Sequence, residues 1–423
     1  MESLNKYYIF LKDKNIENYE ELKEYVLGDL YKLKTKENDD LLLIYNNEES
    51  NISEELVRFF NGVIINKSNL KIVCYTMDKC YEENNINTGL INIDFHLTLQ
   101  PVYEGALIRI FYTNGKWNLS TKKMLDAFRA KWSSEKSFGD MFVEVFPQYL
   151  DYLKNKDCCY SFLVGHQENN LIEINQNYVV HLNTIDLVNN IYVDEKIDIP
   201  ELNYIHDISQ FEGVIEIMNQ EQLMNKINEL KQNNEINHQI GYMLINKDKN
   251  VYQKFIKNNY IEIRELWGNT NSRLFRYLHL RKNPEKLKKY LEIFIHEKNK
   301  LLEYENYLMG IAAFILNTYR NRHISKIITK VPFYIRDIIY KIHGLYLQTK
   351  NKVNFQDVNV ILHDLDEKKF CYVINNIEKE KKELQASMEN HESINVENNE
   401  NMIIDNDIDN EKNIQNEVSM NIS

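Results

Sequence analysis

Basic and aromatic residues alternate over a short stretch in the last third of the chain. Residues 273–289 hold seven bases and one acid, with Phe275, Tyr277 and His279 among them. The seven bases are Arg273, Arg276, Arg281, Lys282, Lys286, Lys288 and Lys289. Lys and Arg bind phosphates with release of counterions, and aromatic rings stack on unpaired bases. The stretch predicts an RNA-binding face, although a solvated helix with its aromatic side chains in the core has the same pattern.

A second basic group follows in the same region. It comprises Arg320, Arg322, His323, Lys326, Lys330 and Arg336. Two such groups in one helical region favour a shared RNA surface more strongly than a single basic helix would.

Several other kinds of chemistry lack the residues that they need. Only 12 Gly and 5 Pro occur in 423 residues, and no Walker-type or dinucleotide-binding glycine motif is present. The five Cys are scattered without paired CxxC spacing, and the His residues lack the two-His spacing of a zinc helix. We therefore expect free thiols in a reducing compartment and no structural metal.

The sequence also indicates the cellular compartment of the protein. No run of about 18 apolar residues occurs, and residues 1–14 mix charges with aromatics, unlike the apolar region of a signal peptide. These patterns predict a cytoplasmic protein that does not associate with membranes.

The net charge of −12 is concentrated at the C-terminus. Residues 384–423 carry nine acids and one base, so the rest of the chain has a net charge of only −4. This segment has few apolar residues to offset its ordering entropy, so we predict a disordered acidic tail at 379–423. A tail of this charge could contact a basic partner or the chain's own helical domain.

Apolar spacing predicts the elements that position these residues. Strands are expected at 41–45, 63–65, 72–76, 106–111, 116–119, 159–164, 171–174, 178–182, 191–193, 214–217, 241–246 and 251–256, and helices at 16–34, 122–131, 138–153 and 220–231. Further helices are expected at 285–298, 301–321, 331–345 and 355–376. The fold class is therefore α+β, with an antiparallel-sheet domain at 1–265 and an all-α domain at 266–378.

The firmest local prediction is a hairpin at Asn114-Gly115. Alternating apolar residues precede this pair, and Lys116-Trp117-Asn118-Leu119 follows it. Asn-Gly between two such runs is the strongest short-range hairpin signal, because both residues tolerate positive φ.

Four stretches, in order along the chain, resemble the motifs of covalent nucleotidyltransferases. They are NGVIINKSNLKIVCYTMDK, VYEGALIRIF, SFLVGHQENNLI and IGYMLINKDKNVYQKF. Their order is most similar to the RNA-ligase-like proteins related to phage T4 RNA ligase 1 that occur in large DNA viruses. The resemblance spans roughly residues 41–370 and implies a nucleotidyltransferase-like domain, which for a viral protein would work in the host cytoplasm.

The resemblance also implies a reaction and a set of site residues. Members use Mg²⁺ and ATP or GTP to form a lysyl-nucleotide, and then act on RNA ends. The nucleotide-binding positions that it implies include Glu104, Gly105, Glu168, Asn169 and Lys254. Arg109, which alternates with Lys116 onto one face of the hairpin, is a further nucleotide-binding candidate that could line a phosphate site.

The chain departs from the family pattern at the nucleophile. Val102 occupies the expected lysine position, and Phe162 or Ser161 and Ile240 stand where acids are expected. Lys79 and Lys116 are candidate displaced nucleophiles, since both are expected near the same strands. Three hypotheses stay open: an active RNA-ligase-like enzyme, an inactive nucleotide- or RNA-binding module, and a viral structural or interaction protein.

Overall fold

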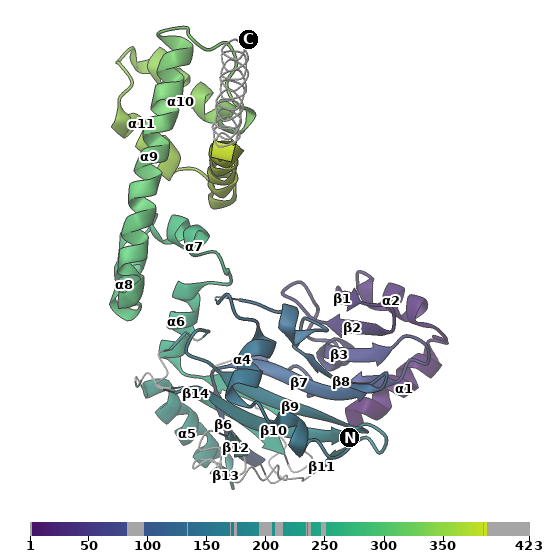
Figure 1. Cartoon of the computed structure of the whole chain (residues 1–423). Helices are drawn as coiled ribbons and strands as arrows, with labels where there is room; N and C mark the ends of the chain where they lie inside the picture. Colours follow the sequence, from purple (N-terminus) through teal and green to yellow (C-terminus); the bar gives the residue numbers. More distant parts are fainter. Residues whose placement is uncertain are drawn as a thin grey trace, which may run out of the picture. The chain divides into compact units, whose positions relative to one another are not determined.

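The computed structural model divides the chain into two compact units, Met1–Asn271 and the part from Ser272 onward (Figure 1). It describes residues 2–82, 97–132, 134–169, 171–172, 176–193, 205–207, 215–233, 235, 238–246, 251–383 and 385–386. The first unit combines three sheets with helices, and the second unit is helical over its described residues. The α+β class, with a helical C-terminal part, is confirmed.

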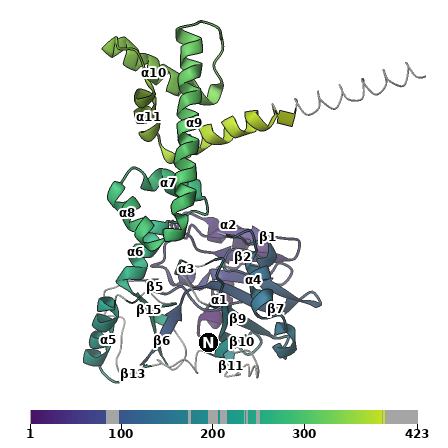
Figure 2. The same cartoon turned by 60° about the vertical axis from the view of Figure 1, so that its left-hand side comes forward.

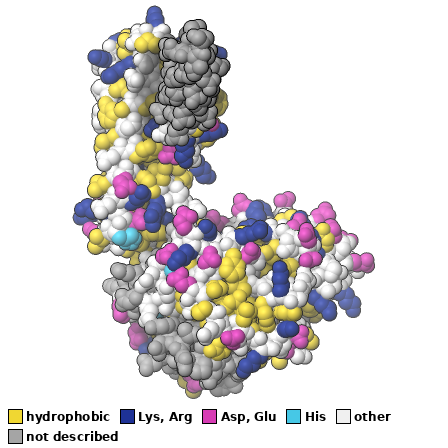
Figure 3. All heavy atoms as spheres, in the orientation of Figure 1, with side chains coloured by type: hydrophobic (Ala, Val, Ile, Leu, Met, Phe, Trp, Pro, Cys, Tyr) yellow, Lys and Arg dark blue, Asp and Glu magenta, His cyan; other side chains and the backbone are white. Residues whose placement is uncertain are grey.

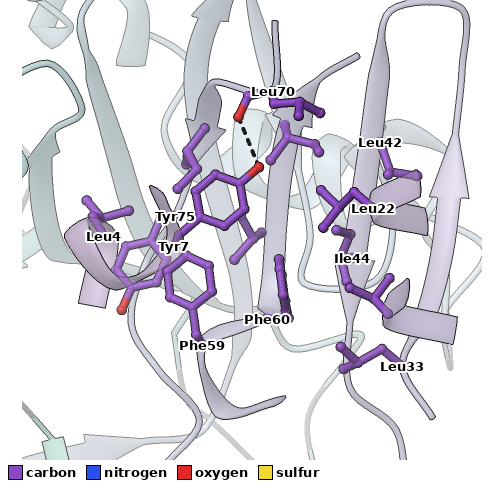
Figure 4. Packing of buried hydrophobic residues seen from close by; sticks show 14 of the residues in the cluster. Leu4, Tyr7, Leu22, Leu33, Leu42, Ile44, Phe59, Phe60, Leu70 and Tyr75 are labelled. Atoms are coloured by element: carbon purple, nitrogen blue, oxygen red, sulfur yellow. Dashed lines mark hydrogen bonds between the residues drawn. The ribbon is translucent and has the colours of Figure 1, made fainter. Parts of the chain in front are cut away.

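The first sheet is antiparallel, and the N-terminal helices pack against it. Its strands, in spatial order, are β1 (Lys34–Glu37), β2 (Leu41–Tyr45), β3 (Asn61–Asn66) and β4 (Ile72–Cys74). The helices are α1 (Glu2–Asp13), α2 (Tyr19–Leu27) and α3 (Glu55–Phe59). Their shared core contains Leu4, Tyr7, Leu22, Phe59 and Phe60, all nearly or fully buried (Figure 4).

Two larger sheets complete the first unit. The six-stranded sheet contains β7 (Ala106–Thr113), β8 (Lys116–Ser120), β9 (Cys158–Gly165), β10 (Tyr178–Asp186), β11 (Ile191–Val193) and β12 (Ile205–Asp207). The five-stranded sheet contains β5 (Tyr81–Glu82), β6 (Leu97–Tyr103), β13 (Ile215–Ile217), β14 (Gln239–Asn246) and β15 (Val251–Ile256). The described helices that accompany them are α4 (Phe138–Val145), α5 (Gln220–Gln232) and α6 (Asn258–Trp267). Pairing is antiparallel except between β10 and β12 and between β15 and β5.

The predicted Asn114-Gly115 hairpin is confirmed. Asn114 and Gly115 have φ values of 51° and 77°, and β7 and β8 pair from Thr113 with Lys116 onward. Positive φ at both central residues is the geometry that suits the right-handed twist of the two strands. Local sequence chemistry was sufficient to specify this turn.

The second unit is built around one long helix. Its elements are α7 (Arg273–Leu280), α8 (Pro284–Ile293), α9 (Lys298–His323), α10 (Arg336–Thr349), α11 (Phe355–His363) and a further helix at 367–383. Helix α9 carries buried residues at helical spacing, including Leu308, Ile311 and Ile315, and it contacts α10 and α11 (Figure 2).

Several predicted bounds differ in the structure. The helix expected at 16–34 spans only Tyr19–Leu27, and Lys34 begins β1. The helix expected at 122–131 is only a short 3₁₀ turn at Ala127–Arg129, because Asp126 caps it and Thr121 bridges back to Met124. The boundary expected after residue 265 falls inside α6, and the units divide after Asn271. The helix expected at 355–376 is two helices, the second of which runs to 383, beyond the expected start of the tail. Residues 387–423 of the predicted tail lie outside the described residues.

The buried Tyr7 hydroxyl provides a stability test of the first unit. It donates to the Leu70 carbonyl at 3.0 Å, and Leu70 adopts a positive φ of 55° (Figure 4). We expect Tyr7→Phe to lower the free energy of unfolding by about 1–2 kcal/mol, because the carbonyl loses its donor inside the core. Urea denaturation measures this change. Tyr8→Phe is the control, since that ring is 37% exposed and its change should stay below about 0.5 kcal/mol. Equal effects of the two substitutions would contradict the expected role.

Candidate active site

A cavity of about 1180 Å³ lies in the first unit, between its two larger sheets. Strands β6, β14 and β15 of the five-stranded sheet line it through residues that include Val102, Met243 and Lys254. Strands β9 and β10 of the six-stranded sheet line it through Leu163 and Val180. The cavity exceeds the usual volume of small-molecule sites, which is roughly 300–1,000 Å³.

The chain crosses between these two sheets at Glu104-Gly105. Strand β6 ends at Tyr103 in one sheet, and β7 begins at Ala106 in the other. A side chain on Gly105 would meet the Val164 carbonyl oxygen at 2.7 Å, so only glycine allows this approach to β9. The crossing therefore sets how close the two sheets lie beside the cavity.

The Glu104 carboxyl holds this crossing in place. It accepts hydrogen bonds from the backbone N–H groups of Leu171 and of Ile172, the latter at 3.1 Å. The Tyr178 hydroxyl donates to the Glu104 carbonyl, and the Glu104 N–H donates to the His238 carbonyl at 2.9 Å. Burial raises the pKa of Glu104 to about 7, against the smaller lowering effect of its two backbone donors. Glu104 lines the cavity as expected, but its carboxylate binds backbone donors and does not point freely at a ligand.

Four cationic side chains line the cavity. Lys79 follows β4, Lys122 follows β8, Lys254 lies on β15 and Arg264 lies on α6. Positive charges from four separate elements meet here, an arrangement that suits a polyanionic ligand.

Aromatic rings and one further carboxylate complete the lining. The rings are Tyr103, Trp132, Tyr192, Tyr260 and Trp267. The carboxylate is Asp78, whose Oδ1 accepts a hydrogen bond from the Tyr75 hydroxyl at 2.6 Å. Among the described residues, no three His, Cys, Asp or Glu side chains gather as a set of metal ligands.

The predicted nucleophile position lies inside the cavity. Val102 lines it and is paired with Gly241 of β14, next to Ile240, which also lines it. Ser161 is buried, with its hydroxyl 3.0 Å from the Thr76 hydroxyl. The site thus places apolar or neutral groups at the positions where the resemblance implies a lysine and acids.

The predicted lysines and binding residues separate into two groups. Lys79, Gly105, Asn169 and Lys254 line the cavity. Lys116 does not, because it lies exposed beside the Asn114-Gly115 turn. Lys116 pairs with Thr113 at the turn end of the hairpin and therefore lies outside the cavity lining.

Arg109 and Glu168, two of the predicted nucleotide-binding residues, also lie outside the cavity lining. Arg109 is fully buried outside the cavity lining, and its guanidinium donates to the carbonyls of Gly62 and Thr121, the latter at 2.6 Å. It connects β3 to β7 and the end of β8 rather than facing a ligand. Glu168 is exposed and pairs with Lys136 at 2.7 Å.

Sequence reasoning missed Lys122, Arg264 and Trp267. Lys122 was placed in a helix that does not form, and no helix was predicted at α6, which carries Arg264 and Trp267. The exposed ring of Trp132 also lines the cavity. For Lys122, a basic residue close after a strand was the available signal.

The predicted RNA-binding stretch at 273–289 is largely engaged within its own unit. Arg276 is buried, and the Arg273 Nε lies 3.3 Å from the buried Glu297. The other ion pairs are Arg281 with Glu305 at 3.7 Å, Lys282 with Glu367 at 3.1 Å and Lys288 with Glu292 at 3.9 Å. Acids elsewhere in the unit pair with part of this stretch, while Arg273, Lys282, Lys286, Lys288 and Lys289 are exposed, so RNA binding by the stretch stays a prediction.

Comparisons with known proteins give distant similarities. No family model matches the chain. It is 28% identical over 253 residues to an "Immediate-early protein ICP-46 homolog" of Invertebrate iridescent virus 6, covering 54% of each chain. The chain thus spans about half the length of this curated relative.

The similar solved structures are ATP-dependent ligases. One is an archaeal ATP-dependent RNA ligase, with a TM-score of 0.41 and 10% identity, covering 68% of this chain and 78% of that one. Another is a putative ATP-dependent DNA ligase from Aquifex aeolicus, with a TM-score of 0.38 and 14% identity, covering 67% of this chain and 75% of that one.

No described helix is long and apolar enough to span a membrane.

The buried Glu104 predicts a pH dependence of stability. Its pKa rises from 4.5 in the unfolded chain to about 7 in the fold, so its protonation favours the folded state. That contribution is fully present below pH 4.5 and is lost as the pH rises through 7. It amounts to on the order of 3 kcal/mol.

We expect Glu104→Gln to reduce the difference in unfolding free energy between pH 5 and pH 8, measured by urea denaturation. Glu168→Gln is the matched control, because that glutamate is exposed. The control should retain the wild-type pH dependence. An unchanged pH dependence in Glu104→Gln would contradict the assignment.

Proposed function

We propose that the first unit is a ligase-like nucleotidyltransferase that binds ATP or GTP in its cavity and acts on RNA ends. The observation that carries this proposal is the convergence of Lys79, Lys122, Lys254 and Arg264 on one cavity lined with aromatic rings. Cations suit the triphosphate, and rings suit the base of a nucleotide. The order of the four sequence motifs supports the same conclusion, and kinship with phage T4 RNA ligase 1 stays a prediction.

The cavity residues fit a nucleotide that carries Mg²⁺. Mg²⁺ is usually held by one or two carboxylates together with substrate phosphates, and it would neutralise charge on those phosphates. Asp78 is the carboxylate available for this role. Lys122, Lys254 and Arg264 would bind phosphate oxygens, and Asn169 would donate or accept a hydrogen bond at the cavity edge.

Lys79 is the proposed nucleophile. Its backbone is anchored by a hydrogen bond from its N–H to the Arg58 carbonyl at 2.8 Å, and its side chain is half-buried in the cavity wall. The deprotonated amine would attack the α-phosphate, forming a phosphorus–nitrogen bond as pyrophosphate leaves. The nucleotide would then pass to a 5′-phosphate on RNA, which restores the lysine.

A second candidate function is that of a nucleotide- or RNA-binding module without catalysis. Val102 favours it, because the position implied for the nucleophile lies in the cavity and bears no nucleophilic atom. A viral interaction protein is the third hypothesis, motivated by the similarity to an iridescent virus protein. For each of these functions we propose the host cytoplasm as the location.

The two lysines of the sequence analysis provide a matched test of catalysis. After incubation with Mg²⁺ and ATP, or GTP, we expect the intact mass to increase by one nucleoside monophosphate, and acid should remove the increase. Lys79→Gln should abolish the gain, because the attacking amine is gone, whereas Lys116→Gln should retain it.

A gain that persists in Lys79→Gln would reject Lys79 as nucleophile, and peptide mapping would locate the lysine that carries the nucleotide. A wild-type protein that binds ATP by calorimetry but gains no mass would reject catalysis and favour the binding module.

The acidic tail is proposed to compete with RNA for basic side chains. Deleting residues 384–423 removes a net charge of −8 and should tighten RNA binding at low salt. Fluorescence anisotropy with labelled RNA at 50 mM and 200 mM salt measures the change. The gain should shrink at the higher salt, and unchanged affinity at both would reject competition.

A further inference from the structure

The end of α9, the connection that follows it and the start of α10 form an exposed part of the helical unit in which α9 and α10 are in contact. We call it the α9–α10 surface; its charged members are Arg320, Arg322, Lys326, Lys330, Arg336 and Lys341. The connection folds back on α9, since the Ser325 N–H donates to the Arg320 carbonyl and the Ile327 N–H donates to the Asn321 carbonyl, both at 2.9 Å.

Stacked imidazoles join the two helices beneath this surface. The rings of His323 and His343 lie with centroids 4.0 Å apart and planes 18° apart, and Tyr319 stacks on His323 at 5.1 Å. The end of α9 is thereby attached to the middle of α10. The bases on both helices and on their connection are consequently held in one region.

The surface is strongly positive. Six bases and one acid, Asp337, lie within residues 320–341, and Asp337 pairs with Lys369 at 2.8 Å. Within the described part of the chain, no carboxylate forms an ion pair with any of the six bases, and all six are exposed. The stretch at 273–289 differs, because Glu297, Glu305 and Glu367 pair with three of its bases, Arg273, Arg281 and Lys282. Lys and Arg side chains are visible at the end of the helical unit where α9 ends (Figures 1 and 3).

Exposed rings lie among these bases. Phe333 is 74% exposed and Tyr340 is 63% exposed, although aromatic side chains of this size are usually covered. The Arg336 guanidinium lies 5.2 Å from the centre of the Phe333 ring. A ring that is exposed beside a guanidinium offers a flat stacking face and a phosphate contact next to each other.

We propose that the α9–α10 surface binds single-stranded RNA, with phosphates on its six bases and unpaired bases stacked on Phe333 and Tyr340. Paired bases in a duplex present no free faces to such rings, whereas a single strand does. The choice of RNA as the strand rests on the proposed function; the location of the surface rests on the charges and the rings alone.

Fluorescence anisotropy with a labelled 20-nucleotide single-stranded RNA and the full chain tests the location. The triple variant Arg320→Gln, Lys326→Gln, Lys330→Gln should weaken binding at least tenfold at 50 mM salt. The slope of log affinity against log salt should fall by about 2, since each lost phosphate contact on a single strand contributes about 0.7. The control triple variant Lys286→Gln, Lys288→Gln, Lys289→Gln on α8 should change affinity less than threefold.

Phe333→Ala tests stacking separately from charge. It should weaken binding about tenfold with an unchanged salt slope, while Phe333→Tyr retains affinity because a flat ring is restored. Both substitutions are at an exposed position, and circular dichroism confirms that the variants fold.

Three results would overturn the proposal: no RNA binding by the wild type, an equal loss in the control triple variant, or an unchanged affinity in Phe333→Ala. Poly-glutamate bound as tightly as RNA would also overturn it, and would indicate an acidic protein partner. A labelled single-stranded DNA of the same length that binds more tightly than the RNA would reject RNA as the strand. The nucleotide mass gain, measured on the same samples, reports on the proposed function independently of RNA binding.

Discussion

The crossing at Glu104-Gly105 is the constraint on which the cavity depends. One backbone step carries the chain from the five-stranded sheet to the six-stranded sheet, and the absence of a side chain on Gly105 allows close contact with β9. The Glu104 carboxyl then binds the backbone N–H groups of Leu171 and Ile172 after β9, and Leu171 lines the cavity. Burying a carboxyl costs free energy, which is why its pKa rises to about 7. Hydrogen bonds offset part of this cost, because the Glu104 carboxyl accepts from the backbone N–H groups of Leu171 and Ile172, which would otherwise lack this acceptor.

In the first unit, the cations proposed to bind the nucleotide are distinct from the position where the resemblance implies a nucleophile. Cations around the cavity come from four elements, so no single strand determines their grouping. A nucleophile, in contrast, needs one amine at one position, and Val102 occupies the position that the motif order implies. The proposed binding of a polyanion by these cations therefore does not depend on whether an amine such as that of Lys79 has replaced the missing one.

Arg109 shows that a buried cation can serve the fold alone. Its guanidinium binds two backbone carbonyls and lies near a pair of buried thiols, Cys74 and Cys159, whose sulfur atoms are 3.5 Å apart. Burial by itself would raise the pKa of Cys74, but the hydrogen bond from Cys159 and the Arg109 charge lower it to about 7. Arg109 thus interacts with groups from three strands, and this role leaves none of its charge facing the cavity.

The sequence by itself determined the α+β class, the hairpin at Asn114-Gly115 and most strands, because these features depend on alternation and turn chemistry within a few residues. Motif order predicted that Gly105, Asn169 and Lys254 share one site, and its position near the same strands made Lys79 a candidate nucleophile; all four residues line one cavity. Only the tertiary structure decided which bases pair with acids. The bases at 273–289 and at 320–341 have similar composition, but acids distant in the sequence pair with Arg273, Arg281 and Lys282 of the first group and with none of the second among the described residues. Likewise, Lys116 is the first residue of β8 and Lys122 follows that strand, and only Lys122 lines the cavity. Burial and ion pairing depend on residues far apart along the chain, so spacing within one segment does not reveal them.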